Sequence, residues 1–275
     1  MMLKQEPLDG AAYLGREVFY ARMHAGVTQR ELAIATHYKA PYISKVENGT
    51  LLASEQFVAA CDRFFNTSGY FTRLRQQIVE RSHPSWFVPY VKLEQSAASI
   101  CNYSNSMIMG MLQTEAYATA VYRSAHPRES AAEISDRVAA RVRRREVMRR
   151  ENPPLLWAIL HEACLRIKVG GPGVMAEQMS YLLEQAEAPH VTVQVLPFSA
   201  GAPAAHSQFI VLTQQDGLPV VYTETSIRGH VDESASAVEE AQATYDCLRA
   251  AARSPEDSLA MIREAMEAYS HEAHS

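Results

Sequence analysis

The sequence predicts a multi-domain protein in which an all-α head, residues 1–80, precedes an α+β mixed body, residues 89–270. Three observations lead to this prediction. The chain has 275 residues, enough for about two domains of roughly 100–200 residues each. Apolar residues in the first part recur every three or four positions, as in short helices. The second part mixes such stretches with runs rich in Val, Ile and Thr, which are typical of strands.

The head begins with a helix whose apolar positions are Leu14, Val18, Ala21 and Ala25. Gly26-Val27 interrupts it. Thr28, with Glu31 three residues later, has the spacing of a capping box and predicts the start of a second helix. That helix ends near Thr36-His37.

Further helices complete the head. One runs from about Ala40 to Asn48 and stops at Gly49, a residue type common just beyond helix ends. Another begins after Ser54, and five helices in all are expected over residues 11–80. The string Ser82-His83-Pro84-Ser85 breaks the pattern and predicts a linker over residues 81–88.

The body reads as a mixture of strands and helices, followed by a short tail, residues 271–275, that we expect to fray. Strands are expected at Ser99–Tyr103, Leu155–Leu160, Leu165–Val169, Val191–Leu196, Gln208–Thr213 and Val220–Thr225. Helices are expected at Thr114–Ser124, Glu129–Asn152, Met175–Ala186, Ala237–Ala252 and Pro255–Tyr269.

Composition and charge exclude several classes of protein. The longest apolar runs are far shorter than the roughly 18–20 residues that cross a membrane. Residues 1–10 carry charges and no apolar stretch, so we expect no secretory signal and a cytoplasmic location. The net charge of −5 argues against a protein that coats nucleic acid indiscriminately. Residues 1–80 hold nine Lys/Arg and eight Asp/Glu, so the surplus acid belongs to the second part.

The four cysteines, Cys61, Cys101, Cys164 and Cys247, stand far apart and form no Cys-x-x-Cys pair. Neither a zinc ribbon nor a thioredoxin motif can therefore be built locally. Each has apolar neighbours in the sequence, and we expect reduced thiols in the core. We expect no metal and no cofactor.

Two short helices joined by a tight turn at Thr36–Lys39 have the arrangement of a helix-turn-helix, whose second helix enters the major groove of DNA. Gln29 stands in the first turn of the helix that begins after Thr28, where an anion such as a phosphate is favoured. Lys45 can donate to guanine, and Asn48 stands near a phosphate position. The candidate DNA-binding residues are Thr28, Gln29, Lys39, Ala40, Pro41, Tyr42, Ser44, Lys45 and Asn48. The alternative is a helical bundle with a solvated face.

The strings Gly26–Ala33 and Tyr42–Gly49 closely resemble the Cro/repressor-like (XRE-type) DNA-binding domain, over Leu14 to about Phe65. The resemblance implies a buried ion pair that ties the first helix to the end of the recognition helix, here Arg22 with Glu47. It also implies that double-stranded DNA is the partner. One departure is Lys39, which stands where the family often has Ser or Thr and cannot accept a capping hydrogen bond.

The body resembles the C-terminal domain of WhiJ-like regulators, a group of actinomycete XRE-type proteins. The matching strings are Gly110–Ala118, the Arg-rich stretch through Arg144, His161–Leu165, Val193–Phe198 and Val221–Glu224. This domain has no known function. The resemblance implies a small partner protein encoded nearby, in an arrangement likened to antitoxin–toxin pairs. Met109 departs from the family, which usually has Pro there.

The body carries no strong catalytic motif, and we do not expect an enzyme. His161-Glu162 lacks the second His that a zincin places one turn later. Gly170–Gly173 lacks the Lys-Ser/Thr of a phosphate-binding loop and reads as a turn. The carboxylates Glu94, Glu115, Glu162 and Glu224 are scattered, although they could meet in a pocket.

The expected helix from Ile134 to Asn152 holds seven arginines within fourteen residues, against the single acid Glu146. A solvated face that pairs with acids elsewhere is one reading. The others are a docking surface for an acidic partner and an auxiliary phosphate contact. Candidate residues for binding a partner or ligand are Arg141, Arg144, Arg145, Gln113, Glu162 and Glu224.

These observations predict a sequence-specific DNA-binding transcriptional regulator, a homodimer that reads a pseudo-palindromic operator. Its body would bind a small partner protein or ligand that modulates DNA binding. The alternative is an antitoxin-like module that sequesters a small partner protein and binds DNA for autoregulation. A third reading places an active site in the body, which would need two carboxylates in one pocket with raised pKa.

Overall fold

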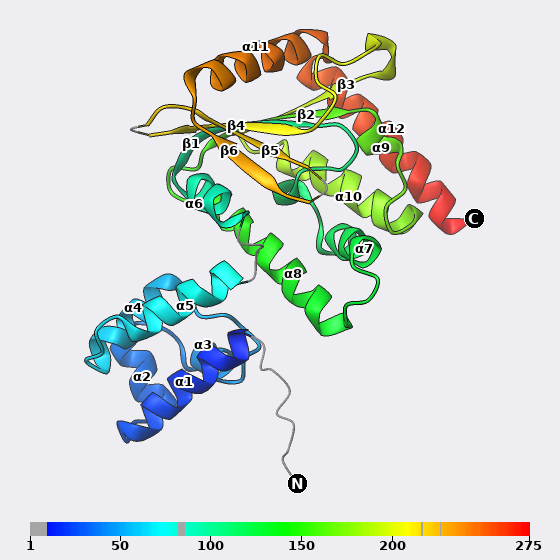
Figure 1. The fold of residues 1–275 in the computed structure, drawn as a ribbon. Helices are drawn as coiled ribbons and strands as arrows, with labels where there is room; N and C mark the ends of the chain where they lie inside the picture. The colour runs from blue at the N-terminus through cyan, green and yellow to red at the C-terminus, as the bar shows by residue number, and fades with distance from the viewer. Residues whose placement is uncertain (1–9, 82–85, 216, 226) are drawn as a thin grey trace. The chain divides into compact units, whose positions relative to one another are not determined.

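The computed structural model describes residues 10–81, 86–215, 217–225 and 227–275 (Figure 1). The chain divides into two compact units, residues 1–84 and residues 85–275. The first contains the head and the second the body, and each is described by itself. Residues 82–85 of the expected linker lie outside the described residues. Trp86 and Phe87, which we placed in the linker, pack against the core of the body.

The described part of the head consists of five helices, which confirms the all-α prediction. They are α1 (Gly10–His24), α2 (Gln29–Thr36), α3 (Ala40–Glu47), α4 (Glu55–Phe64) and α5 (Tyr70–Arg81). One apolar core joins them, with Leu14, Leu32, Ile43 and Phe57 fully buried. Gly15 lets α1 approach α3 closely, because a Cβ there would collide with the carbonyl oxygen of Val46.

Local signals set the ends of the two central helices of the head. Thr28 and Glu31 form a capping box at the start of α2. His37 ends α2 in the left-handed conformation, with φ 61°. Lys39 gives α3 no side-chain cap, but Pro41 lies in the first turn, where its missing N–H costs no hydrogen bond.

The body is built on a six-stranded mixed sheet with the order β3-β2-β1-β4-β5-β6. The strands are β1 (Ala97–Ser104), β2 (Leu155–His161), β3 (Val191–Leu196), β4 (Phe209–Gln214), β5 (Val220–Glu224) and β6 (Gly229–Asp232). β1, β2 and β3 run parallel to one another, whereas β4 pairs with β1 in the antiparallel direction and β5 and β6 continue the sheet in antiparallel pairs. The α+β prediction is therefore confirmed.

Alternate residues of each strand supply two separate apolar layers. On β2, Leu156, Ala158 and Leu160 join the larger core, which α10 (Pro172–Gln185) and α12 (Pro255–His274) cover. Ile159 faces the other way and packs in a second cluster with Tyr245 and Leu248 of α11 (Ala235–Ala251). Figure 1 shows α11 and α10 on opposite faces of the sheet.

The remaining body elements lie around the larger core. They are α6 (Val88–Ser96), η1 (Gly110–Leu112), α7 (Glu115–Ala125), α8 (Ala131–Arg143), η2 (Arg144–Arg149) and α9 (Ala163–Arg166). A short turn, η3 (Phe198–Ala200), follows β3. Neither α6 nor β6 was predicted from the sequence.

Three expectations about the body are corrected. The expected strand Leu165–Val169 is wrong, because its first two residues belong to α9. The carbonyl groups of Leu165 and Arg166 accept hydrogen bonds from Tyr269 Oη and not from a neighbouring strand. The expected helix Glu129–Asn152 is α-helical only to Arg143 and continues as the tighter 3₁₀ helix η2. The last helix does not end at Tyr269, since α12 continues to His274.

The cysteines are all free thiols. Cys61 and Cys164 are buried, and Cys101 is half-buried. Cys247 is exposed, so the expectation of a core thiol is wrong there. It lies on α11 between Tyr245 and Leu248, the residues that face the sheet, and its own side chain therefore points outward.

Candidate nucleic-acid interface

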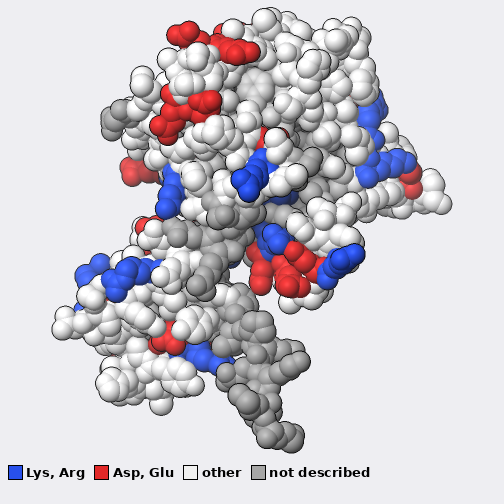
Figure 2. All heavy atoms as spheres, in the orientation of Figure 1, with Lys and Arg blue, Asp and Glu red and all other residues white. Residues whose placement is uncertain are grey.

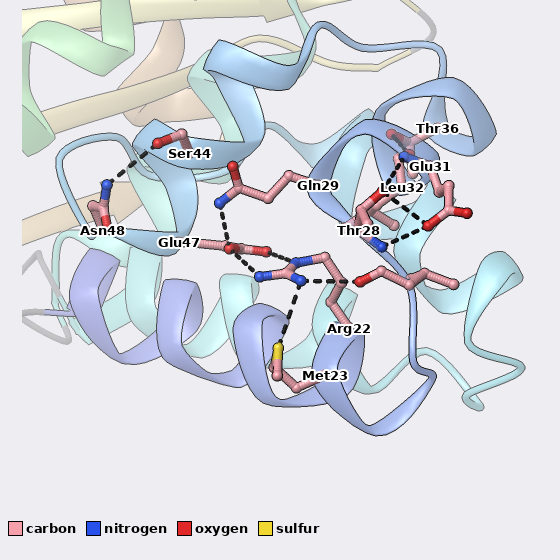
Figure 3. Close-up of polar contacts among 11 residues, drawn as sticks. Arg22, Met23, Thr28, Gln29, Glu31, Leu32, Thr36, Ser44, Glu47 and Asn48 are labelled. Carbon is pink, nitrogen blue, oxygen red and sulfur yellow. Dashed lines mark hydrogen bonds and ion pairs between the residues drawn. The ribbon is translucent and has the colours of Figure 1, made fainter.

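A buried ion pair joins the first and third helices of the head (Figure 3). Arg22 Nε lies 2.5 Å from Glu47 Oε1, and Arg22 Nη2 donates to Glu47 Oε2 at 2.9 Å. The two side chains are only 9% and 3% exposed. Arg22 Nη1 also donates to the carbonyl oxygen of Val27, at 3.0 Å. The pair therefore fixes the end of α1 against the end of α3 and the loop that leads to α2.

Gln29 belongs to the same network. Its Nε2 atom donates to Glu47 Oε2 at 2.7 Å, so one carboxylate holds residues from α1 and α2 against α3. We expected the Gln29 side chain to contact a phosphate. In the structure its amide nitrogen is already engaged, and it positions α2 relative to α3.

The α2–turn–α3 segment has the arrangement of a helix-turn-helix. Leu32 of α2 and Ile43 and Val46 of α3 are fully buried and hold the two helices together. Because α3 has its apolar residues on one side, its opposite side is left for the predicted contacts. Pro41, Lys45, Asn48 and the preceding Lys39 are exposed, and Ala40 and Ser44 are half-buried. Asn48 Nδ2 reaches Ser44 Oγ at 3.4 Å, so these two polar side chains are neighbours.

Thr28 and Tyr42, also predicted to bind DNA, make contacts within the head. Thr28 Oγ1 accepts a hydrogen bond from the backbone of Glu31 and caps α2. Tyr42 stacks on Tyr38 at 4.5 Å between ring centroids, and its hydroxyl oxygen accepts a hydrogen bond from the backbone N–H of Ser54. Both side chains therefore shape the segment that presents α3.

A second buried ion pair lies in the body and engages Arg144, one of the candidates for binding a partner or ligand. Arg144 Nε and Nη2 donate to the two carboxylate oxygens of Glu94 at 2.8 and 2.6 Å. The side chains are 10% and 2% exposed. Tyr90 Oη also donates to Glu94, at 2.6 Å. Glycine at position 110 leaves room for this arginine, because a Cβ there would lie 3.1 Å from Arg144 Nη1.

Arg141 and Gln113 lie together in the interior of the body, next to that pair. Arg141 Nη1 donates to Gln113 Oε1 at 2.7 Å, and its guanidinium lies 4.1 Å from the centre of the Tyr122 ring. Desolvation lowers the pKa of Arg141. Tyr122 is a contact that sequence reasoning missed, since neither its spacing nor its type distinguishes it from an ordinary helix residue.

Of the remaining candidates, Glu224 lies close enough to Arg141 and Arg144 for both guanidinium groups to act on its pKa, whereas Glu162 and Arg145 have other neighbours. Glu162 pairs with Arg166 at 3.1 Å and accepts a hydrogen bond from the backbone N–H of Phe198. Arg145 faces a separate cavity, described below. Glu224 lines a cavity of about 60 Å³ with Asn102 and Ser104, and burial raises the pKa of its carboxyl group. Of the four scattered carboxylates, Glu224 is the one that lines this cavity.

The surface over α8 carries both signs of charge. Arg137 forms two hydrogen bonds with Glu129, at 2.7 and 2.6 Å. Figure 2 shows basic and acidic side chains next to one another in this region. Part of the arginine-rich stretch is thus a solvated face paired with acids, whereas Arg141 and Arg144 point into the body.

Within the part of the chain that the structure describes, no group of three or more His, Cys, Asp or Glu side chains could hold a metal ion. In the same residues, every helix is too short or too polar to cross a membrane.

The α2–turn–α3 geometry defines a helix-turn-helix protein, and this class indicates a DNA-binding regulator. Comparison with family models agrees: residues 14–70 match a helix-turn-helix domain. Residues 87–264 match the domain of unknown function DUF5753, and the chain belongs to this family. No curated protein and no solved structure matches the chain.

Proposed function

We propose that this protein is a sequence-specific DNA-binding transcriptional regulator of the cytoplasm that acts as a homodimer. The observation that carries the proposal is the outer side of α3, where small and polar side chains surround the exposed Lys45. The buried pair of Arg22 and Glu47 holds this helix in a fixed orientation, which reading base edges requires.

Each exposed residue of α3 has a specific role in this proposal. Lys45 donates to guanine O6 or N7, and Ser44 bonds a base edge. Ala40 and Pro41 contact a thymine methyl group. Lys39 and Asn48, at the two ends of the helix, contact phosphates. Thr28, Gln29 and Tyr42 act indirectly, because Thr28 Oγ1, Gln29 Nε2 and the Tyr42 hydroxyl oxygen make hydrogen bonds within the head.

The nearly neutral charge of the head supports the dimeric part of the proposal. Nine Lys/Arg against eight Asp/Glu in residues 1–80 give little general attraction to DNA. Two heads on one duplex, about one helical turn apart, would supply the affinity that one head lacks. The resemblance of the body to WhiJ-like regulators supports a further part of the proposal, namely that the body binds a small partner protein or ligand that modulates DNA binding.

Selection of bound duplexes from a random pool tests the proposal. We expect enrichment of a pseudo-palindrome whose half-sites lie about 10 base pairs apart, centre to centre. A pool that stays random after repeated rounds, with folded protein, would contradict sequence-specific binding. Enrichment of a single half-site would contradict the homodimer but would still support sequence-specific binding.

The antitoxin-like alternative differs in the consequence of partner binding. If a partner changes the affinity of the protein for DNA by some factor, linkage requires that DNA changes the affinity of the protein for that partner by the same factor. Equal affinity for a candidate partner with and without operator DNA would favour sequestration over regulation.

A further inference from the structure

A cavity of about 100 Å³ in the body lies between η1, η2, the C-terminal half of α10 and the turn that leads into β3. Its polar lining consists of Arg145, Arg149, Tyr181, Gln185 and His190. The volume is several times the roughly 10–15 Å³ that one ordered water molecule needs. Arg149 is exposed, so the cavity can be reached from solvent.

Arg145 is the unusual residue of this cavity. Its Nε and Nη2 atoms are buried and have no hydrogen-bond partner among the described residues. The guanidinium lies 4.9 Å from the centre of the Tyr181 ring, which holds it in place without satisfying those donors. Buried N–H groups of a charged side chain are costly to leave unpaired, so this position favours a hydrogen-bond acceptor.

The unpaired edge of Arg145 is the one this protein uses elsewhere to bind carboxylates. Arg22, Arg137 and Arg144 each present Nε and Nη2 to the two oxygens of a glutamate. This edge matches a planar carboxylate or two phosphate oxygens with two parallel hydrogen bonds. Arg145 presents the same two donors with no carboxylate opposite.

The surroundings favour an anion. Arg149 adds a second guanidinium, and Gln185 and His190 add polar groups. Glu184 lies near Tyr181 and helps to raise the pKa of its hydroxyl group. Among the described residues, however, Glu184 forms no ion pair with Arg145 or Arg149. Met111, Leu112 and Met148 line the rest of the cavity with apolar surface.

We propose that this cavity binds a small organic oxyanion, a carboxylate or a phosphate monoester with a short apolar group. A small rotation of the Arg145 side chain turns its Nε and Nη2 edge toward the cavity, where the oxyanion lies on it next to Arg149, and the apolar group packs against Met111, Leu112 and Met148. This inference rests on the part of the proposed function in which the body binds a ligand, and it names the chemical class of that ligand. Binding is measured without DNA, so its failure leaves the DNA-binding proposal untouched.

Calorimetric titration of the full chain with n-butyrate, n-propyl phosphate and inorganic phosphate tests the proposal. We expect saturable binding of at least one organic probe, and weaker binding of inorganic phosphate because it lacks the apolar group. Arg145→Gln should weaken that binding at least tenfold, and Arg149→Gln several-fold. Arg150→Gln is the matched control, because Arg150 is exposed, follows η2 and does not line the cavity. It should leave the affinity unchanged.

Circular dichroism and thermal unfolding without ligand establish that each variant is folded. Arg149→Gln changes an exposed side chain, so it keeps the test decisive even where Arg145→Gln disturbs the fold. Absence of saturable binding by any probe to the folded wild-type chain would overturn the proposal. So would equal affinities for wild type, Arg145→Gln and Arg149→Gln, since these would indicate binding elsewhere.

Discussion

Arg22 and Glu47 lie 25 residues apart in the sequence, yet two hydrogen bonds of 2.5 and 2.9 Å join them in the interior of the head. Because Gln29 donates to the same carboxylate, all three helices of the α1–α2–α3 segment are fixed by one acidic side chain. The orientation of the exposed side of α3 therefore depends on a residue that itself cannot touch DNA.

Removing one partner of this pair should destabilise the head strongly. Arg22→Met leaves the Glu47 carboxylate buried without its main partner, and the expected loss is about 3–5 kcal/mol in the free energy of unfolding. Urea unfolding of the full chain measures it. The double variant Arg22→Met with Glu47→Met should recover part of the loss, because no unpaired charge remains. Single and double variants of wild-type stability would show that the pair does not hold the head together.

The pair of Arg144 and Glu94 predicts a similar effect in the body. Glu94→Gln should cost about 3–5 kcal/mol, since it leaves the Arg144 guanidinium buried without a countercharge. Scanning calorimetry should show the change in the transition of the body, while that of the head keeps its midpoint. Arg150→Gln, an exposed arginine of the same stretch, serves as the control and should have almost no effect.

Asp62 predicts a dependence of head stability on pH. Burial alone would raise the pKa of its carboxyl group, but hydrogen bonds from Thr67 and from Thr72 and Phe71 at the start of α5 outweigh burial and lower it. A lowered pKa means that the ionised form stabilises the folded state. This stabilisation is complete above the ordinary pKa of Asp, about 3.9, and is lost as the pH falls through the lower pKa of the folded state.

Asp62→Asn should therefore be less stable than wild type at pH 7, by about 1–3 kcal/mol. The difference should shrink as the pH falls below about 4, where the carboxyl group of the unfolded chain takes up a proton, and should be smallest below the lower pKa of the folded state. Thermal unfolding from pH 2 to pH 7 measures both parts. A difference that is constant over this range would show that the ionisation of Asp62 contributes nothing.

Lys45 predicts a defect in specificity, with little change in folding. Its side chain is exposed on α3, so Lys45→Ala should leave the stability of the head unchanged. It should relax base preference at one operator position, by about 1–3 kcal/mol. Lys39→Ala is the matched control, because a phosphate contact should weaken binding to all duplexes about equally. If Lys45→Ala behaved like Lys39→Ala across a set of operator variants, Lys45 would not read a base.

The head could be predicted in detail because its signals are local. The capping box of Thr28 and Glu31, the Ser54 cap and the glycine after α3 each mark a helix end within a few residues. Most strands of the body were predicted for a similar reason, since Val and Ile runs mark them. β6 was not predicted, because its four residues are too few for a clear pattern, and it forms a strand by pairing with β5.

The interior of the body could not be predicted, because its polar contacts join distant residues. Arg144 and Glu94 stand 50 positions apart, and nothing near either residue indicates the other. A run of arginines in a sequence indicates an exposed surface, and only the helical geometry of the segment shows which of them point inward. The 3₁₀ helix η2 brings residues three apart onto one side, so that Arg144 and Val147 face inward. The helix α6 holds Pro89 in its first turn, where a proline is tolerated.

In the proposed function, the exposed side of α3 reads a DNA sequence. Fluorescence anisotropy of the full chain tests it most directly, on a duplex recovered by selection and on a scrambled duplex of the same composition, at several salt concentrations. We predict binding to the selected duplex roughly a thousandfold tighter or more, with a salt slope of about −0.9 per phosphate contact. Equal affinity for the two duplexes at every salt concentration would contradict the claim.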